Sequence, residues 1–550
     1  MKKERIISLL ILFSLLLVTV LFFTACKKDG DDVNAGDGTL PVEERLFTNK
    51  TQYFNGEEIY VTAYGKDNQT VGIYRANDDI SNTDAIREYT IGRDGFVSGN
   101  TYAFKKSSKL NQSRQALKYL PNGKYKFVLF KDGGKEVEFS KNIEILVEKI
   151  QKPIAPSKVT YTLDNLQNGL ADGDLKITLD KKSYAEEIVM YWANGNGKLD
   201  DYTALAPFFA LNNDFTFEMY SNTIIPNNAT KLWLYSKNSI GISDEYYEVV
   251  LPENCQFSQD TEAICEFQVV SDIHIAVDDT HCMTPDTKEV HKAHLLAMCD
   301  DILNISPNSS GIFVAGDIAN SGRRYEWELA DSLFKSFENL PDVYYSLGNH
   351  DLYGGESFDT LVQNFYDFAG VNSVYYEKNI GGYHHIFLGT ESKKSGVDAD
   401  LSDKQLAWFD SKMQELTSAE PNKPVFVYLH QSLYNTIAGS FPGQGWDGIM
   451  QDSQFKAIVE KYKQIVMFNG HSHWDMNTRG SMYSNGKNMP NIFNTASVGY
   501  LWTSFYLPAG EYLTGSQGYY VKVFENKILV YGRDFTENKY IPSACFVAAI

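Results

Sequence analysis

Five short polar motifs, each at the end of an apolar stretch, constrain this chain more than any other feature of its sequence. From about residue 258 the segments 265–274 and 310–317 have the pattern of strands, and 288–306 has the length and pattern of a helix. This alternation predicts an α/β layered domain. The motifs are Asp272-Ile273-His274, Gly316-Asp317, Gly348-Asn349-His350-Asp351, His430-Gln431 and Gly470-His471-Ser472-His473. Ligands of α/β sheets bind outside the carboxyl ends of the strands, so the five motifs imply one site.

The motifs supply side chains that suit metal ions. They contain seven oxygen or imidazole donors: Asp272, His274, Asp317, Asn349, His430, His471 and His473. Hard and borderline divalent metals take such ligands, and seven donors are too many for one tetrahedral ion but suit two ions that share a bridge. In Asp-x-His and His-x-His, alternate residues of a strand would point the same way. The glycines before Asp317, Asn349 and His471 would allow the tight backbone that closes a loop around ions.

In this order the motifs resemble the calcineurin-like metallophosphoesterase family, whose pattern is DxH, GD, GNH(D/E), H and GHxH. The resemblance covers roughly residues 260–500. It implies a four-layer αββα sandwich, with the C-terminal strands completing the second sheet. It also implies two divalent ions, with manganese, iron and zinc all open.

The same resemblance assigns roles to individual residues. One metal would be bound by Asp272, His274 and His473, and the other by Asn349, His430 and His471, with Asp317 as the bridge. His350 would be the catalytic histidine near the leaving-group oxygen.

The expected chemistry is hydrolysis of phosphoric esters. Two ions can activate a bridging hydroxide for attack on phosphorus, and a protonated His350 can donate a proton to the departing alkoxide. We expect Asp351 to orient or charge-stabilise His350. Arg323 and Arg324 are candidate substrate-binding residues, although surface arginines at a helix start are an equal alternative.

The substrate class is less constrained. The segment 316–320 is most similar to the bacterial cyclic-nucleotide and glycerophosphodiester phosphodiesterase branch, so a phosphodiester is favoured. Asn320 stands where purple acid phosphatases have tyrosine, and the GDxxDRG pattern of protein phosphatases is absent from the sequence. A phosphomonoesterase for nucleotides or sugar phosphates and a non-catalytic surface binding or adhesion protein are the alternatives. Trp446, Trp474, Trp502 and Tyr500 could stack a base or sugar or serve in packing.

The net charge of −20 disfavours nucleic-acid polymers as partners, because a polyanion would be repelled. The expected partner is a small phosphoester, since the local charge of the metals outweighs distant carboxylates. Five histidines outside the motifs are expected to be surface or satisfied buried groups: His281, His291, His294, His384 and His385.

The N-terminus has the features of a targeting segment. Basic residues precede an apolar run from Ile6 to Phe23, and Phe23-Thr24-Ala25-Cys26 resembles a lipobox. This predicts a signal peptide over 1–25, lipidation of Cys26 and a membrane-anchored, extracytoplasmic lipoprotein of a bacterial cell envelope. An uncleaved membrane anchor is the alternative. Residues 26–44 have the composition of a flexible tether.

Two strand-rich regions precede the α/β domain. Short alternating segments with turn signals fill 45–150 and again 158–252, which predicts two immunoglobulin- or fibronectin-like sandwiches before a phosphoesterase domain over 258–550. Such modules could contact glycan or protein, or act as spacers. The cysteines after Cys26 show no CxxC spacing and are expected to be mostly buried or incidental.

Overall fold

The computed structural model describes residues 46–549 except 49, 58, 66–68, 91–96, 106–107, 118–119, 132–133, 135, 164–168, 181, 211–212, 220–221, 254, 258–261, 279–286, 442–445, 447, 479, 485–489 and 503–511. The predicted signal peptide, Cys26 and the tether lie outside the described residues. Within the described part of the chain, no helix is long and apolar enough to cross a membrane.

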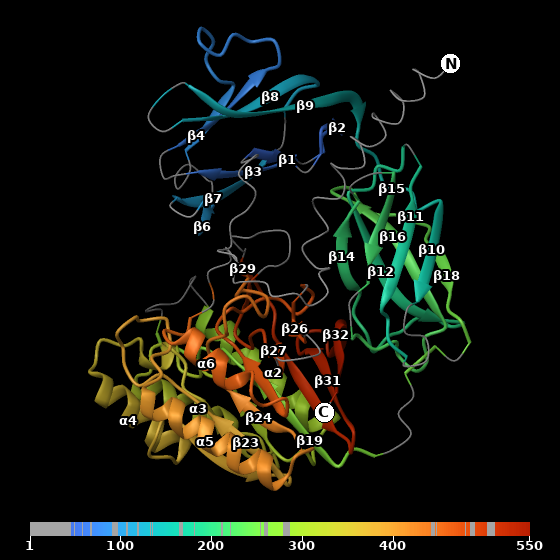
Figure 1. Cartoon of the computed structure of the whole chain (residues 1–550). Coiled ribbons are helices and arrows are strands. Elements are labelled where there is room, and N and C mark those ends of the chain that lie inside the picture. Colours follow the sequence, from blue (N-terminus) through green and yellow to red (C-terminus); the bar gives the residue numbers. More distant parts are fainter. Residues whose placement is uncertain are drawn as a thin grey trace, which may run out of the picture.

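The first strand-rich region contains two sheets with the orders β1-β3-β7-β6 and β2-β9-β8-β4-β5 (Figure 1). Its strands are β1 (Leu46–Thr48), β2 (Gln52–Asn55), β3 (Ile59–Gly65), β4 (Thr70–Arg75), β5 (Arg87–Thr90), β6 (Val97–Lys105), β7 (Ser108–Leu117), β8 (Gly123–Phe130) and β9 (Val137–Lys149). Alternate residues of β8, including Tyr125, Phe127 and Leu129, are fully buried in the core between these strands. Val128 and Phe130, on the other face of β8, are buried in a second cluster with Tyr74, so this end of the strand is covered on both faces.

The second strand-rich region also has two sheets, ordered β10-β11-β15 and β13-β12-β16-β17, with β14 paired to β12 and β18 paired to β16. Its strands are β10 (Lys158–Leu163), β11 (Gly173–Thr178), β12 (Glu187–Asn194), β13 (Gly197–Lys198), β14 (Leu205–Phe209), β15 (Asp214–Glu218), β16 (Lys231–Asn238), β17 (Gly241–Ile242) and β18 (Tyr247–Val250). Trp192 is buried in its core. The likeness of either region to a particular sandwich family stays a prediction.

The C-terminal region contains two six-stranded mixed sheets. The first has the order β21-β20-β19-β30-β31-β32, with bounds β19 (Cys265–Val270), β20 (Ile312–Val314), β21 (Val343–Tyr345), β30 (Gln517–Val523), β31 (Lys527–Asp534) and β32 (Lys539–Ala549). The second has the order β22-β23-β24-β25-β27-β26, with bounds β22 (Tyr376–Ile380), β23 (Tyr383–Phe387), β24 (Val425–Tyr428), β25 (Ile465–Asn469), β26 (Met482–Tyr483) and β27 (Asn491–Asn494). A short pair, β28 (Leu501–Trp502) and β29 (Tyr512–Leu513), forms a two-stranded sheet of its own, and Leu501 packs in the core between the two large sheets.

Helices cover the outer face of each sheet. They are α2 (Thr287–Ile305), α3 (Arg324–Phe334), the 3₁₀ turn η3 (His350–Leu352), α4 (Phe358–Ala369), α5 (Asp403–Ala419) and α6 (Asp452–Val459). One core joins α2, α3 and α4 to the first sheet, and another joins α5 and α6 to the second. A third core, rich in aromatic side chains such as Phe267, Phe313 and Tyr428, lies between the two sheets. This is the metallophosphoesterase fold that the sequence predicts.

Local sequence signals explain several element boundaries. Ser402 begins α5 by accepting a hydrogen bond from the Gln405 N–H, as the capping pattern predicts. Trp327, Ala330 and Phe334 form the buried face of α3. Helix α4, which the sequence reasoning did not identify, starts at the Ser357 cap and ends at Gly370 with φ 64°.

The second strand-rich region docks against the edge strand β32. The Thr203 N–H donates to Tyr540 O at 2.9 Å, and the Ile224 N–H donates to Cys545 O at 2.8 Å. Ile224 and Phe257 share a small apolar core with Phe524 of the C-terminal region. The edge of the first sheet is therefore covered, which removes unpaired backbone groups from solvent.

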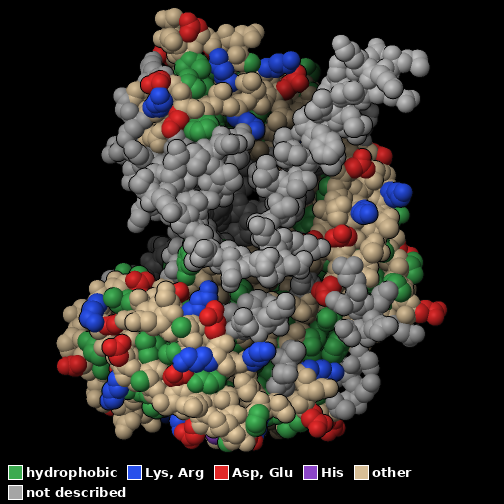
Figure 2. Space-filling model, viewed as in Figure 1, with side chains coloured by type: hydrophobic (Ala, Val, Ile, Leu, Met, Phe, Trp, Pro, Cys, Tyr) green, Lys and Arg blue, Asp and Glu red, His purple; other side chains and the backbone are tan. Residues whose placement is uncertain are grey.

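The described cysteines Cys255, Cys265, Cys299 and Cys545 are free and buried, in agreement with the sequence reasoning. Cys282 lies outside the described residues. On the described part of the face in Figure 2, acidic and basic side chains are interspersed.

Candidate metal centre

The five motifs leave the sheets at neighbouring strand ends. β19, β20 and β21 run parallel in one sheet, as do β24 and β25 in the other. Each motif begins one or a few residues after its strand ends, for example at Asp272 after Val270 and at His430 after Tyr428. The carboxyl ends of the two sheets therefore deliver all five motifs to one place, as predicted.

The backbone brings the ligands together in a way that the sequence did not predict. Asp272, His274, Asp317, His471 and His473 all have left-handed φ values, between 51° and 69°. None of them lies within a strand, so the Asp-x-His and His-x-His pairs do not point together through strand alternation. Non-glycine residues in this region cost free energy and persist where the surrounding structure fixes them, which is typical of functional sites.

The motif glycines are needed for close approach. A Cβ on Gly348 would lie 2.1 Å from Asp317 Oδ1, and one on Gly470 would lie 2.4 Å from Asp272 Oδ2. A Cβ on Gly316 would lie 2.5 Å from the Nδ1 of His430. Each glycine therefore makes room for a predicted ligand from another loop.

Asp272, His274 and His473 form the first cluster, and all three are buried. The Nε2 atoms of His274 and His473 lie 3.1 Å apart. Asp272 Oδ1 is 2.9 Å from the Nε2 of His473 and 3.7 Å from that of His274. These are the three residues expected to hold one metal.

Asp317 lies between this cluster and His430. Its Oδ2 is 3.0 Å from the Nε2 of His430 and 3.8 Å from the Nε2 of His274. The position suits the bridging role expected for Asp317. Asp272 Oδ1 also lies 3.8 Å from the Nε2 of His430, so both carboxylates contact both halves of the site.

Asn349 and His471 complete the second half. Asn349 is buried, and its Oδ1 has no hydrogen-bond partner among the described residues. The His471 ring lies 5.2 Å from the His430 ring, and its backbone N–H donates to Asp272. A buried amide oxygen that accepts no hydrogen bond can offer its lone pair to a cation, so Oδ1 of Asn349 suits the role of a metal ligand.

The donor set fits divalent metal ions. Imidazole nitrogens and carboxylate oxygens converge within a few ångströms at a buried site, where leaving them unpaired is costly. The second ring nitrogen of each of two ligands is fixed by a carbonyl: Nδ1 of His430 donates to Ala315 O at 2.8 Å, and Nδ1 of His473 donates to Tyr500 O at 2.9 Å. These bonds leave Nε2 as the metal-facing atom.

The electrostatics favour the ligand forms of Asp272 and His274, whereas His430 holds a proton that a bound metal ion would displace. Burial by itself raises the pKa of Asp272, but attraction to His473 and His430 outweighs it and holds the pKa well below its ordinary value. Burial lowers the pKa of His274 to about 4. For His430, burial acts downward, but Asp317 and Asp272 raise the pKa to about 10. The carboxylates therefore create a strong local demand for positive charge, which metal ions would meet.

His350 lies at the edge of the centre and contacts it closely. Its backbone N–H donates to Asp317 Oδ1 at 2.7 Å, and its Nδ1 donates to Asn320 O at 2.9 Å. Its ring centroid is 4.6 Å from that of His274. Because Nδ1 is bonded to Asn320, Nε2 is the nitrogen that can exchange a proton with a substrate.

Asp351 acts on the backbone rather than on the His350 ring. Its carboxylate accepts hydrogen bonds at 2.9–3.0 Å from four buried N–H groups, those of Asp317, Ile318, Ala319 and Gly348. The expected orientation of the imidazole by Asp351 is therefore wrong, because its lone pairs are used by the loop that carries Asp317. Asp351 fixes the geometry of a ligand loop instead.

Arg323 and Arg324, the candidate substrate-binding residues, bond to side chains outside the metal centre. Arg324 hydrogen-bonds Glu328 and Asp367, and 65% of its side chain is exposed beside α3 and α4. Arg323 donates to the Tyr325 hydroxyl at 2.8 Å and lies 3.9 Å from Glu356. These contacts support the surface alternative for both residues, and the proposed chemistry uses neither.

Two histidines outside the motifs, His291 and His294, lie beside the centre and are hydrogen-bonded to backbone carbonyls, which is one of the alternatives that the sequence analysis gave them. His291 is buried, with Nδ1 2.9 Å from the backbone oxygen of His274. Its ring stacks on Tyr500, whose ring lies 4.1 Å from that of His473. His294, three residues along the same helix, donates to Gly499 O at 2.8 Å. Their spacing on one face of α2, directly after the first motif, is the signal that could have identified them.

The aromatic candidates separate clearly. Trp474 is fully buried and serves in packing. Trp446 lies 5.7 Å from His471 and 6.1 Å from Trp502, ring to ring. Of the four candidates, Trp446, Trp502 and Tyr500 therefore lie beside the centre.

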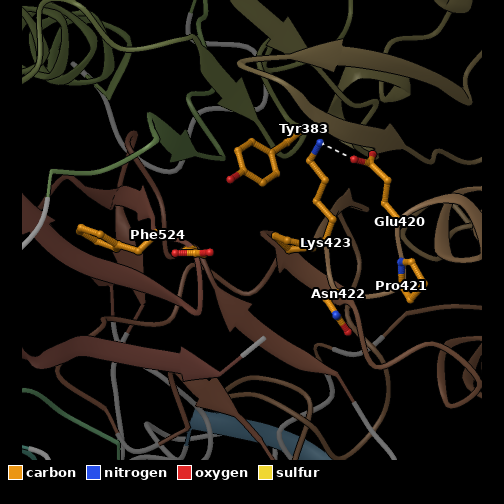
Figure 3. Close-up of a pocket in the computed structure, with 8 residues that line it drawn as sticks. Tyr383, Glu420, Pro421, Asn422, Lys423 and Phe524 are labelled. Atoms are coloured by element: carbon orange, nitrogen blue, oxygen red, sulfur yellow. Dashed lines mark hydrogen bonds and ion pairs between the residues drawn. The ribbon is translucent and has the colours of Figure 1, made fainter.

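A separate hollow of about 360 Å³ lies at the other end of the strands (Figure 3). Tyr383 and Pro424 at the starts of β23 and β24, together with Lys423, which pairs with Glu420, are among its lining residues. It is remote from the motifs, because these follow the opposite ends of the strands.

The match to a family model agrees with the geometry. The model of the calcineurin-like phosphoesterase family matches residues 267–475. No curated protein matches the chain significantly. A purple acid phosphatase from yellow lupin is 12% identical with a TM-score of 0.39, over 90% of this chain and 93% of the lupin chain. A 5'-nucleotidase of Staphylococcus aureus, described as putative, is 13% identical with a TM-score of 0.30, over 52% of this chain and 54% of its own.

Proposed function

Because residues 267–475 form a calcineurin-like phosphoesterase domain, we propose that this protein is a dinuclear-metal hydrolase of small phosphodiesters. The observation that carries the proposal is the convergence of two buried carboxylates with the Nε2 atoms of three histidines in one centre. Asp272, His274 and His473 would hold one ion, and Asn349, His430 and His471 the other, with Asp317 shared. When bound, the two ions would neutralise the phosphoryl oxygens and lower the pKa of a water for attack on phosphorus.

The chain's own residues supply the remaining steps. The carbonyl of Asn320 accepts the Nδ1 proton of His350 and orients the ring, so that in the imidazolium form Nε2 carries the proton that passes to the departing alkoxide. The Asp351 carboxylate accepts three N–H groups of the Asp317 loop, those of Asp317, Ile318 and Ala319, and so positions the shared carboxylate. The phosphodiester preference is supported by the resemblance of 316–320 to phosphodiesterases.

We also propose that the chain is a lipoprotein of a bacterial cell envelope. The support is the apolar run before Phe23-Thr24-Ala25-Cys26. Metabolic labelling with a radioactive fatty acid would mark the wild-type protein but not Cys26→Ser.

The catalytic proposal is tested with bis(p-nitrophenyl) phosphate and p-nitrophenyl phosphate on manganese-loaded full-length protein. We expect turnover of both esters, with higher kcat/KM for the diester, and about two manganese ions per chain by elemental analysis. Asp317→Asn should lower kcat by at least about a hundredfold, because the shared carboxylate is lost. Asp403→Asn, at an exposed position of α5, is the matched control.

Each result bears on a different part of the proposal. Turnover of the monoester alone would replace the diester preference with phosphomonoesterase activity. Metal binding without turnover of either ester would favour the binding or adhesion alternative. If elemental analysis finds no bound ions after incubation with manganese, the proposed function is wrong.

A further inference from the structure

A cavity of about 160 Å³ opens beside the second half of the metal centre. It is lined by Asn349, Leu352, Tyr353, Thr390, Ser392, Lys393, Gly396 and Asp398. Asn349 is one of the predicted metal ligands. The Tyr353 ring stacks on His350, with centroids 4.9 Å apart and planes within 13°. The cavity is therefore bounded by a ligand and by the neighbour of the proposed proton donor.

Hydrogen bonds from Lys393 hold two walls of the cavity together. Its ammonium donates to Gly354 O at 2.8 Å and lies 3.4 Å from Glu356 O. These bonds join the wall formed by 390–398 to the loop that follows His350. Because both acceptors are neutral carbonyls, the charge of Lys393 is not cancelled by them.

The second charged group of the wall is Asp398. Its carboxylate is hydrogen-bonded by the hydroxyl of Ser395, and its backbone N–H donates to the same hydroxyl at 3.1 Å. One ammonium and one carboxylate thus line the same small space. Such a pair gives no net preference for an anion or a cation, but offers a donor and an acceptor to an uncharged polar group.

The size restricts the occupant further. Pockets for drug-sized ligands are typically about 300–1,000 Å³. The 160 Å³ of this cavity is about half the lower end of that range, so its size favours a compact alcohol with a few hydroxyl groups over a nucleoside.

We propose that this cavity binds the leaving alcohol of the substrate, and that this alcohol is a compact, uncharged, hydroxylated group. The inference rests on the proposed phosphoesterase function and names the substrate class of that site. A hydroxyl of the alcohol would donate to Asp398 and another would accept from Lys393. The ester oxygen would then lie on the side of the centre that carries His350.

The test compares leaving groups on the wild-type enzyme and on two variants. Symmetric diesters make the leaving group unambiguous, so the substrates are bis(glyceryl) phosphate, a dinucleoside phosphate and bis(p-nitrophenyl) phosphate. We expect the wild-type kcat/KM to be higher for the glyceryl ester than for the dinucleoside. Asp398→Asn and Lys393→Met should each lower kcat/KM for the glyceryl ester about tenfold, as loss of a charge-assisted hydrogen bond does.

The aryl ester separates this inference from the proposed function. Its leaving group has no aliphatic hydroxyl, so Asp398→Asn should keep its kcat/KM within about threefold. Lys393→Met also removes the bonds to the loop after His350, so for this variant we expect a larger loss of kcat/KM on the glyceryl ester than on the aryl ester. Asp403→Asn should leave kcat/KM unchanged for all three esters. Equal loss on all three esters, no loss on the glyceryl ester, or a preference for the dinucleoside would each overturn the inference. Absence of wild-type turnover on every ester would instead overturn the proposed function.

Discussion

The Nε2 atoms of His274 and His473 lie 3.1 Å apart in a buried setting, although 199 residues separate them in the chain. Two imidazole nitrogens at this distance need either a shared proton or a common cation. The Asp272 carboxylate 2.9 Å from one of them favours the cation. This single contact links the first and last motifs and fixes the first half of the proposed centre.

Removal of the His350 side chain should separate catalysis from metal binding. We expect His350→Ala to lower kcat about a hundredfold or more, as loss of a general acid does, while two ions remain bound. Elemental analysis and kcat are measured on the same preparation. Loss of an ion with the activity would instead make His350 a ligand, which its position near His274 and Asp317 allows.

His291 should act as a positioning residue for His274. His291→Phe keeps the ring that stacks on Tyr500 but loses the hydrogen bond to the His274 carbonyl. We expect metal affinity to fall about tenfold or more, with kcat recovering at saturating manganese, because the bond from His291 holds the backbone that orients the ligand His274. A fall in kcat that excess metal does not restore would contradict this role. The control is His384→Phe. His384 lies on β23, where its ring pairs with Glu377.

The close approach at Gly348 predicts intolerance of a single methyl group. Gly348→Ala would place a Cβ against Asp317, so we expect loss of metal binding and destabilisation of about 1–3 kcal/mol. Gly355→Ala is the matched control, because a Cβ there meets nothing within 4 Å. Thermal unfolding and metal content of both variants are compared. Equal behaviour of the two would show that the loop can relax.

Glu186 should make the strand-rich part of the chain less stable as the pH rises. Burial, followed by the nearby Glu57, raises its pKa from 4.5 to about 7. Between these values the folded state binds more protons than the unfolded state, so stability falls as the pH rises from about 4.5 to 7. Glu186→Gln should therefore stabilise this region by about 1–2 kcal/mol at pH 8 and by little at pH 4.

Calorimetry of the full-length protein at the two pH values measures this effect, with the exposed Glu245→Gln as control. A stability gain of Glu186→Gln that is equal at pH 4 and pH 8 would contradict the assignment.

The sequence by itself determined the elements that depend on local pattern. Apolar periodicity placed most strands and helices of the C-terminal region, as the buried face of α3 and the Ser402 cap of α5 show. It also determined the donor set, because residue type and position after a strand are both local properties. The convergence of the motifs followed from the general rule that parallel strands end at the same edge.

Only the tertiary structure decided what depends on contacts between distant segments. The left-handed backbone of Asp272 and His473 is fixed by loops packed against them, so strand alternation could not describe it. Asp351 holds the Asp317 loop because its carboxylate accepts four backbone N–H groups that only the folded chain brings together. His291 became part of the centre through packing of α2, and the 160 Å³ cavity through the bond between Lys393 and Gly354. Such contacts have no local sequence signal, since they form only when remote parts of the chain meet.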